Sequence, residues 1–207
     1  CDPEVILRHS ERQLRKQQEF PANITAVGFS RWKQQFITSF LKGSEVTFMK
    51  KFDEKSNSGQ QKTLAVWGST NIPELPETSS VLRIEDGFLR SIGLGADLVH
   101  PLSLVIDDMG IYYDATRSSR LEYILQNEFL NTKARNRAKA LRDRLEALDL
   151  TKYNLVKQPW KYSENDQRVL LVVGQVETDD SIRLGLTNIN TNIKLLRRVR
   201  HENPSAY

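Results

Sequence analysis

The chain has 207 residues, of which 39% are hydrophobic and 27% are charged, and this is the composition of an ordinary globular protein. No apolar run reaches the ~18 residues that span a bilayer. The polar residues 1–20 lead us to expect no signal peptide. The only cysteine, Cys1, excludes an intrachain disulfide and fits a reducing compartment.

The net charge of +4 and an isoelectric point near 9.2 are compatible with an anionic partner such as a nucleotide, a phospholipid or an acidic sugar. This charge density is too low for a dedicated nucleic-acid-binding protein, so we expect no nucleic-acid partner. The three histidines are far apart, and no Cys/His cluster has metal-site spacing, so we expect no structural zinc.

The first elements along the chain alternate between helix and strand patterns. Residues 3–19 are polar with few apolar anchors, which favours a leading or linker helix. Residues 24–29 have the pattern of a short strand, and Ser30 can cap the helix that follows. In that helix the apolar residues recur at helical spacing and predict a core face, made of Trp32, Phe36, Ile37, Phe40 and Leu41.

Further strands are predicted at residues 45–49, 63–67, 80–84 and 102–106. Residues 110–114 fit a short strand or an edge piece. The charged residues 50–62 and the proline-containing residues 71–78 are predicted to be loops. Strands that alternate with helices favour an α/β fold.

Two helices are predicted in the middle of the chain. Ser119 and Glu122 have the spacing of a capping box ahead of a helix at residues 121–129. Residues 131–148 give the clearest helical pattern, with an apolar residue every three or four positions. The outer face of this helix fits either a solvated surface or docking on an anionic membrane, because it is basic throughout: Lys133, Arg135, Arg137, Lys139, Arg142 and Arg144.

The composition changes after this helix and divides the chain. We expect a linker or leading helix at residues 1–23, an N-terminal Rossmann-like domain at residues 24–150 and a crossover linker at residues 151–167. Residues 168–173 are strongly β-forming and precede Gly174, as in the first buried strand of a new parallel sheet. After a polar loop at residues 175–188, Asn190 or Thr191 can cap a helix. Because no second strand follows, we expect residues 168–207 to be the start of an incomplete second domain.

Glu85 and Asp86 are the first candidates for chemistry, because they follow an apolar strand and precede a glycine. Side chains at the carboxyl edge of a strand in an α/β sheet lie where ligands bind. Gly87 allows a tight turn there. The same pattern also occurs in ordinary turns, and turn formation is the simpler role for Asp107 and Asp108, which follow another strand.

Long motifs in a fixed order cover the chain from about residue 24 to its end. They are Gly28-Phe-Ser-Arg-Trp-Lys33, Val66-Trp-Gly68, Glu85-Asp-Gly-Phe-Leu-Arg-Ser-Ile-Gly-Leu-Gly95, Pro101-Leu-Ser-Leu-Val-Ile-Asp-Asp108, Gly110-Ile-Tyr-Tyr-Asp114, Lys152-Tyr-Asn154, Gly174-Gln-Val-Glu-Thr-Asp-Asp180 and Thr191-Asn192. In this order they resemble one family, the bacterial capsular polysaccharide β-Kdo transferases, also known as KpsC-like, LipA-type or capsule polysaccharide export proteins.

This resemblance implies a GT-B architecture, in which two Rossmann-like domains enclose a cleft. It implies a retaining glycosyltransferase that moves the acidic sugar Kdo from CMP-β-Kdo to a phosphatidylglycerol-type lipid acceptor in group 2 capsule biosynthesis. CMP-Kdo is then the donor substrate, and no cofactor or metal is expected. The implied location is the cytoplasmic face of the bacterial inner membrane, as a peripheral protein that contacts anionic lipid and other capsule assembly or export proteins.

Only part of that machinery is expected in these residues. The family's Lys-Pro-His-Pro motif, which contacts the CMP donor, should lie beyond Tyr207. His100-Pro101 is not this motif, because it precedes a strand in the N-terminal half. The chain would then hold the acceptor-side domain and the opening of the donor domain, and we expect it to be inactive alone.

A retaining transfer by double displacement needs a carboxylate that forms a covalent glycosyl-enzyme. We predict Asp86 as the nucleophile and Glu85 as the supporting acid or base. The reverse assignment stays open, because adjacent side chains on an extended chain point apart and only one can readily face the cleft. Gly87, Arg90 and Ser91 are the predicted substrate-binding residues, and Arg90 either neutralises the Kdo carboxylate or pairs with Glu85.

The predicted donor-nucleotide side begins where the strand at residues 168–173 ends. Gly174, Gln175 and Glu177 follow that strand, at the edge where a nucleotide would lie. Thr191 and Asn192 begin a helix and either present backbone N–H groups to a phosphate or only cap the helix.

Two other functions remain open at this point. One is a non-catalytic glycosyltransferase-like module that acts in capsular polysaccharide export or assembly, which the basic helix at residues 131–148 would suit. The other is a generic nucleotide-binding α/β protein. No phosphate-binding glycine-rich loop of the P-loop or dinucleotide type occurs, and Gly93-Leu-Gly95 lacks the third glycine.

Overall fold

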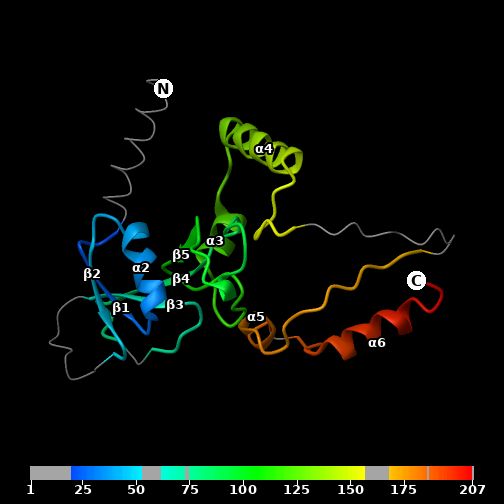
Figure 1. Ribbon diagram of the computed structural model, residues 1–207, viewed down its shortest axis with the longest axis horizontal. Helices are drawn as coiled ribbons and strands as arrows, with labels where there is room; N and C mark the ends of the chain where they lie inside the picture. Colours follow the sequence, from blue (N-terminus) through cyan, green and yellow to red (C-terminus); the bar gives the residue numbers. More distant parts are fainter. Residues whose placement is uncertain (1–19, 53–61, 73–74, 157–167, 186, 207) are drawn as a thin grey trace.

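The computed structural model describes residues 20–52, 62–72, 75–156, 168–185 and 187–206 (Figure 1). The predicted leading helix at residues 3–19 and most of the predicted loop at residues 50–62 lie outside this part of the chain.

The described strands form one mostly parallel sheet, in the order β2-β1-β3-β4-β5. Strands β1 to β4 run parallel, and β5 pairs antiparallel with β4. The mixed α/β fold is therefore confirmed, as are the strands predicted at residues 45–49 and 63–67, whereas β4 continues through both acidic residues. The strands are β1 (Asn23–Val27), β2 (Glu45–Met49), β3 (Thr63–Trp67), β4 (Ser80–Asp86) and β5 (Leu104–Asp107).

Helix α2 (Arg31–Phe40) covers one face of the sheet through the apolar positions that its sequence predicts. Ser30 caps it, because the Ser30 hydroxyl accepts a hydrogen bond from the backbone N–H of Lys33 at 3.4 Å. Phe36, Ile37 and Leu41 are buried, and Trp32 and Phe40 pack partly buried against the same core. A smaller apolar cluster around Val27, Leu64 and Val66 lies apart from this core. β3 is therefore buried along almost its whole length, as expected for a strand inside a parallel sheet.

The strand order creates a switch point between β1 and β3. From β1 the chain passes through α2 to β2 on one side, and β3 then lies on the other side of β1. In open α/β sheets, the crevice at the carboxyl edge beside such a switch point is where ligands bind. The ends of β1, β3 and β4 are consequently the places to look for a site.

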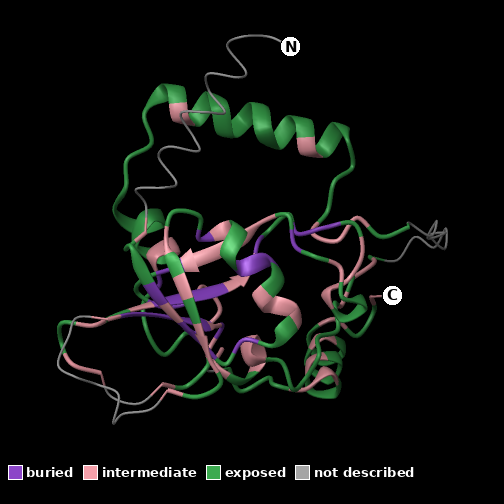
Figure 2. Ribbon diagram, turned by 60° about the vertical axis from the view of Figure 1, so that its left-hand side comes forward, coloured by how far each residue is buried: buried purple, intermediate pink, exposed green. Residues whose placement is uncertain are grey.

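Helices α3 (Arg120–Asn127) and α4 (Thr132–Ala147) form an arm beside the sheet, and α4 stands away from the body of the chain (Figures 1 and 2). The predicted capping box is confirmed: the Ser119 hydroxyl accepts from the backbone of Glu122, whose carboxylate accepts from the backbone of Ser119. No residue of α4 is buried. None of the described helices is long and apolar enough to cross a membrane.

The strand or edge piece suggested for residues 110–114 is wrong, because acidic side chains fold this segment into turns. The Asp107 carboxylate accepts hydrogen bonds from the backbone of Met109 and Gly110, both at 2.9 Å. Asp114 in turn accepts from Thr116. Asx-type bonds of this kind supply the backbone with partners that a strand would otherwise provide. The predicted turn role of Asp107 is confirmed.

The strand predicted at residues 168–173 is also wrong. This segment has no strand partner among the described residues, and Leu171 is 86% exposed. A β-forming run becomes a strand only where a neighbouring strand accepts its hydrogen bonds. The predicted second sheet and the domain boundaries therefore remain predictions. The short helices η2 (Gly95–Asp97) and α5 (Asp180–Arg183) and the longer α6 (Asn192–Glu202) complete the described elements, with Thr191, not Asn190, as the cap of α6.

Candidate active site

A cleft of about 1010 Å³ opens at the carboxyl ends of β3 and β4. It is lined by the last residues of these strands, the loop at residues 68–71, the Tyr112–Tyr113 turn, Lys152 and Tyr153, and part of the segment at residues 175–183. The two predicted catalytic acids, Glu85 and Asp86, both lie in its wall. The cleft therefore joins the carboxyl edge of the sheet to the C-terminal part of the chain.

Glu85 has a partner for each of its carboxylate oxygens. The backbone N–H of Asp86 donates to Oε1 at 2.9 Å, and the Tyr113 hydroxyl donates to Oε2 at 3.2 Å. Burial raises the pKa of Glu85, and the nearby charge of Asp86 acts in the same direction, against the effects of the hydrogen bonds and Lys33. A carboxyl group with a raised pKa is suited to general acid or base catalysis.

Gly68 makes room for this arrangement. Its φ of +53° lies in the left-handed region that favours glycine. A Cβ at this position would overlap the Tyr113 hydroxyl and lie 2.9 Å from Oε2 of Glu85. Glycine at the end of β3 is therefore what allows the tyrosine and the carboxylate to meet.

Asp86 has a different environment from its neighbour. The Nε atom of Arg90 lies 2.7 Å from Oδ2 of Asp86, and Arg90 is only 1% exposed. The other oxygen, Oδ1, is buried without a hydrogen-bond partner among the described residues. Arg90 therefore pairs with Asp86, in contrast to the predicted alternative of a pair with Glu85, and supplies a counter-charge to the predicted nucleophile.

The three predicted substrate-binding residues lie behind the wall of the cleft. Gly87 is buried against Ser103, so that a Cβ on Gly87 would come within 2.7 Å of the backbone carbonyl carbon of Ser103. Arg90 donates hydrogen bonds to the Ser91 hydroxyl and to the Val99 carbonyl, both at 2.8 Å. Gly87, Arg90 and Ser91 therefore take part in packing and hydrogen bonds behind the cleft wall. Their binding of substrate remains a prediction.

Two of the segments that resemble the family are joined behind the acids. The Lys152 carbonyl accepts hydrogen bonds from the backbone of Arg90 and Ser91, at 2.8 and 3.2 Å. The side-chain amide of Asn154 donates to the Ser91 carbonyl at 3.0 Å. Asn154 adopts a φ of +49°, a conformation that asparagine tolerates better than most residues. Residues 152–154 thus hold the loop that follows β4.

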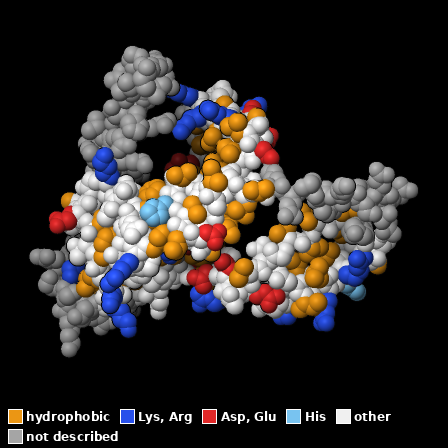
Figure 3. Space-filling model, in the orientation of Figure 1, with side chains coloured by type: hydrophobic (Ala, Val, Ile, Leu, Met, Phe, Trp, Pro, Cys, Tyr) orange, Lys and Arg blue, Asp and Glu red, His pale blue; other side chains and the backbone are white. Residues whose placement is uncertain are grey.

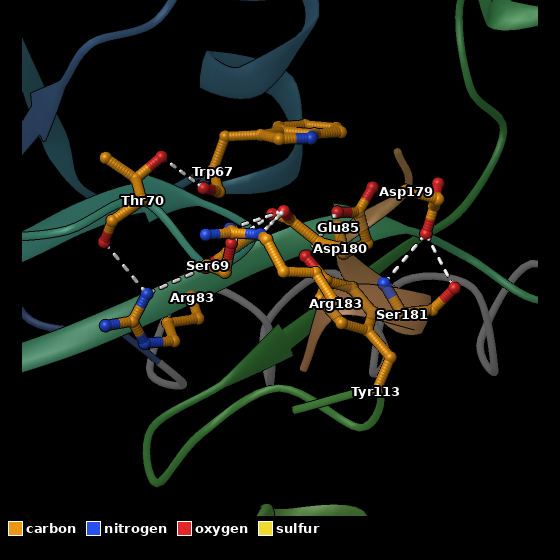
Figure 4. Close-up of polar contacts among 11 residues, drawn as sticks. Trp67, Ser69, Thr70, Arg83, Glu85, Tyr113, Asp179, Asp180, Ser181 and Arg183 are labelled. Carbon is orange, nitrogen blue, oxygen red and sulfur yellow. Dashed lines mark hydrogen bonds and ion pairs between the residues drawn. The ribbon is translucent and has the colours of Figure 1, made fainter. Parts of the chain in front are cut away.

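The opposite end of the chain reaches the cleft through α5 (Figure 4). The Ser69 hydroxyl donates a hydrogen bond to the carboxylate of Asp180, which also pairs with Arg183 at 2.5 Å. The hydrogen bond from Ser69 holds the pKa of Asp180 below its usual value. Buried Arg83 holds the loop at residues 68–71, since its guanidinium donates hydrogen bonds to the carbonyls of Gly68 and Thr70 at 2.8 and 3.1 Å.

Four of the five predicted donor-side residues, all except Gly174, line a separate hollow of about 280 Å³, which shares Gln175 with the main cleft. Gln175 exchanges backbone hydrogen bonds with the side chain of Asn192, each at 2.9 Å. The backbone N–H of Asn192 donates to the Glu177 carboxylate at 2.6 Å. Thr191 caps α6 with its hydroxyl. Capping is therefore observed at this helix start, and a phosphate would have to displace Glu177. Gly174 lies beside Asn192.

Four residues that line the cleft were not among the predicted site residues, namely Trp67, Ser69, Tyr112 and Tyr113, and neither was Lys33, which stands over the ring of Trp67. All except Ser69 lie inside the motifs that carry the family resemblance, and Ser69 directly follows one of them. Burial raises the pKa of Tyr112 to about 12, helped by Glu85 and Asp86, so this phenol stays protonated beside the acids. The signal that could have found Lys33, Trp67 and Ser69 is position, because they begin a helix after β1, end β3 or directly follow the glycine after β3 at one sheet edge. Tyr112 and Tyr113 follow β5, which runs antiparallel to β4 and ends at the other edge, so position along the chain does not indicate them.

Known proteins resemble this chain over most of its length. The family model described as "Capsule polysaccharide biosynthesis protein" matches residues 75–158. The capsule polysaccharide modification proteins LipA of Neisseria meningitidis serogroups A and B are each 39% identical over 202 residues, which is 93% of this chain and 29% of the relative. The lipopolysaccharide-processing protein LpsZ of Rhizobium meliloti is 33% identical over 88% of this chain and 45% of the relative.

Solved structures give the same picture. The KpsC beta Kdo 2,7 transferase of Thermosulfurimonas dismutans is 34% identical, with a TM-score of 0.70 over 89% of this chain and 59% of that structure. The beta Kdo 2,4 transferase of the same organism is 30% identical, with a TM-score of 0.71 over 91% of this chain and 60% of that structure. This chain is KpsC/LipA-like.

The predicted family is therefore confirmed. The KpsC/LipA-like chain spans less than a third of the LipA proteins and about three fifths of the KpsC structures.

Proposed function

We propose that the chain is part of a retaining glycosyltransferase that adds β-linked Kdo from CMP-β-Kdo to a phosphatidylglycerol-type lipid acceptor in capsule synthesis. The observation that carries the proposal is the pair Glu85 and Asp86, which share one cleft but have different electrostatic environments. The likeness to the KpsC transferases supports the choice of sugar. A GT-B arrangement with a second Rossmann-like domain, and a reaction without metal or cofactor, are parts of the same proposal.

The proposed chemistry proceeds by two displacements. The Asp86 carboxylate attacks the anomeric carbon of Kdo, the bond to the CMP phosphate breaks, and a glycosyl ester forms on Asp86. Glu85 then accepts the proton of the acceptor hydroxyl, which attacks the same carbon and releases Asp86. Two inversions give net retention. Arg90 holds the Asp86 carboxylate in place between the two steps.

The test uses the full-length natural protein with CMP-Kdo generated in situ and a Kdo-bearing lipid analogue. Wild type should form product, Asp86→Ala should form none, and Glu85→Gln should be impaired in release of the glycosyl-enzyme, which mass spectrometry would detect on Asp86. Exposed Asp97, which has no side-chain hydrogen bond among the described residues, gives the matched control Asp97→Ala. Equal activity of Asp86→Ala and wild type would reject this mechanism. Folded proteins that all lack activity would favour the non-catalytic role in capsule export.

We further propose that the α3–α4 arm rests on the anionic surface of the inner membrane. Apolar side chains are unusually exposed here, with Leu125 at 75% and Phe129 at 101%. Figure 3 shows Lys and Arg side chains beside hydrophobic ones over this region. Along α4, Leu141 belongs to the apolar stripe, and Arg137 and Arg144 lie seven residues apart on one flank of it. An apolar stripe flanked by cations is typical of helices that lie in a membrane interface.

Vesicle binding tests this surface. Neutralising Arg137 and Arg144 together (Arg→Gln) should weaken binding to phosphatidylglycerol vesicles about 30-fold, because each basic residue near an anionic surface contributes about 1 kcal/mol. The matched control neutralises two exposed lysines away from the arm, Lys42 and Lys51. Equal binding by both double variants would overturn the membrane proposal and leave the arm as a contact surface for capsule assembly or export proteins.

A further inference from the structure

Lys33 lies at the switch point of the sheet, although neither the predicted site nor the proposed mechanism uses it. It belongs to the first turn of α2, which starts just after β1. Its ammonium group stands 3.5 Å from the centre of the ring of Trp67, the last residue of β3. Lys33 thus follows β1 and Trp67 ends β3, and the switch point between these two strands is where α/β sheets bind ligands.

The ammonium group of Lys33 has no oxygen partner. Within the described part of the chain, no carboxylate lies within ion-pair distance of its Nζ and no hydrogen-bond acceptor is bound to it, even though the side chain is half-buried. Burial lowers the pKa of Lys33, while the charges of Glu85 and Asp86 oppose that change. An ammonium group has three N–H donors and no acceptor. A half-buried ammonium group whose donors have no partner can bind an anionic ligand.

The ring beneath Lys33 is held in place. Phe29 and Phe36 contact Trp67 edge-on, with ring centres 6.2 and 6.5 Å away. Trp67 also lines the cleft that contains Glu85 and Asp86. A cation on the face of a fixed indole is positioned by the ring quadrupole without neutralisation of its charge. Lys33 therefore holds a positive charge on a ring that lines the same cleft as Glu85 and Asp86.

The other cations near the cleft are engaged elsewhere. Arg90 is buried and pairs with Asp86, and Arg183 pairs with Asp180. Lys152 stands over the ring of Tyr153 at 5.3 Å and lines the cleft itself, whereas Lys33 adjoins the cleft through the ring of Trp67. Lys152 is thus a natural comparison for Lys33.

We propose that Lys33, seated on Trp67, binds the carboxylate of the acidic sugar that is transferred, and this inference rests on the proposed function. Kdo carries its carboxylate directly on the anomeric carbon. When Asp86 attacks that carbon, two negative groups come close together and repel each other. Lys33 offsets this repulsion and selects an acidic sugar over a neutral one. A phosphate of the lipid acceptor has the same oxyanion chemistry, so the test has to separate the two sources.

The test compares Kdo with its C1 carboxamide as competitors of CMP-Kdo in the full-length natural protein. Wild type should bind Kdo about 10- to 100-fold more tightly than the carboxamide, the ratio that corresponds to about 1.5–3 kcal/mol for a hydrogen bond to a charged group. Lys33→Met should lose this preference, Lys33→Arg should keep most of it, and CMP alone should bind equally to all three. Lys152→Met should retain the preference, and Lys33→Gln replaces Lys33→Met if the latter does not fold.

The outcomes separate the subsite from the proposed function. If Lys33→Met and Lys33→Gln both still prefer Kdo over the carboxamide while Asp86→Ala is inactive, the Lys33 subsite is overturned. The proposed transferase activity is then unaffected. If Lys33→Met impairs binding only when the acceptor carries a phosphate, Lys33 binds the lipid headgroup. That result would overturn its assignment to the sugar carboxylate. If wild type transfers no Kdo, titration calorimetry with Kdo and the carboxamide still decides: equal binding by wild type overturns the subsite.

Discussion

Replacing Arg90 with methionine tests whether this residue is a structural partner of Asp86 or a free substrate ligand. Arg90→Met keeps an unbranched apolar stem but removes the guanidinium group. The change leaves the Asp86 carboxylate without its counter-charge and the Val99 carbonyl without its donor. It also removes the group against which Gly95 packs, because a Cβ on Gly95 would lie 2.8 Å from the guanidinium.

The expected cost follows from burial. Breaking a buried ion pair by removing one partner costs about 3–5 kcal/mol. Asp86 retains 19% exposure, so water can reach it in part, and the lower end of that range applies. For a domain of about 150–250 residues each kcal/mol lowers the melting temperature by about 2–4 °C. Arg90→Met should therefore lower the apparent melting temperature by about 6–12 °C.

Thermal unfolding of the full-length natural protein, followed by circular dichroism, measures this shift. The double variant Arg90→Met/Asp86→Asn should be more stable than Arg90→Met, because the unpaired charge is gone. A shift under about 2 °C for Arg90→Met would refute the structural role and return Arg90 to the predicted group of substrate ligands.

Three further predictions concern single substitutions. Gly87→Ala forces a Cβ against the Ser103 backbone and should lower the free energy of unfolding by about 1–3 kcal/mol. Gly174→Ala meets only ordinary contacts and should lower it by less than about 0.5 kcal/mol. Equal melting temperatures for the two variants would contradict this. Glu85 has a raised pKa in the folded state, so the unfolded chain ionises first as pH rises and wild-type stability falls above about pH 4.5; Glu85→Gln should remove that fall, and parallel pH profiles of stability would disprove it. Ser119→Ala removes a buried cap and should cost about 0.5–2 kcal/mol in denaturant unfolding, and an unchanged midpoint would show that the cap is dispensable.

Local patterns predicted most of the sheet and the helix that covers it, since they act through neighbouring residues. β3 was recognised from a continuous apolar run, and α2 from its spacing and from Ser30. The strand at residues 168–173 could not be judged in this way, because pairing depends on a distant segment. The same limit applies to the candidate site. The position of Glu85 and Asp86 at a strand end was visible, but the partner of Arg90 and the ring beneath Lys33 depend on side-chain directions and on elements far apart in sequence.

Asp107 fastens the arm to the sheet, together with its neighbour Asp108, whose carboxylate pairs with the Arg120 guanidinium at 2.6 Å. Besides its two bonds to the turn at Met109 and Gly110, Asp107 accepts a hydrogen bond at 2.8 Å from the backbone of Arg120, the first residue of α3. Beyond this joint, α4 contributes no buried residue. We therefore expect that residues 132–147 can be shortened or exchanged while the sheet and the cleft keep their shape, because no core contact is lost.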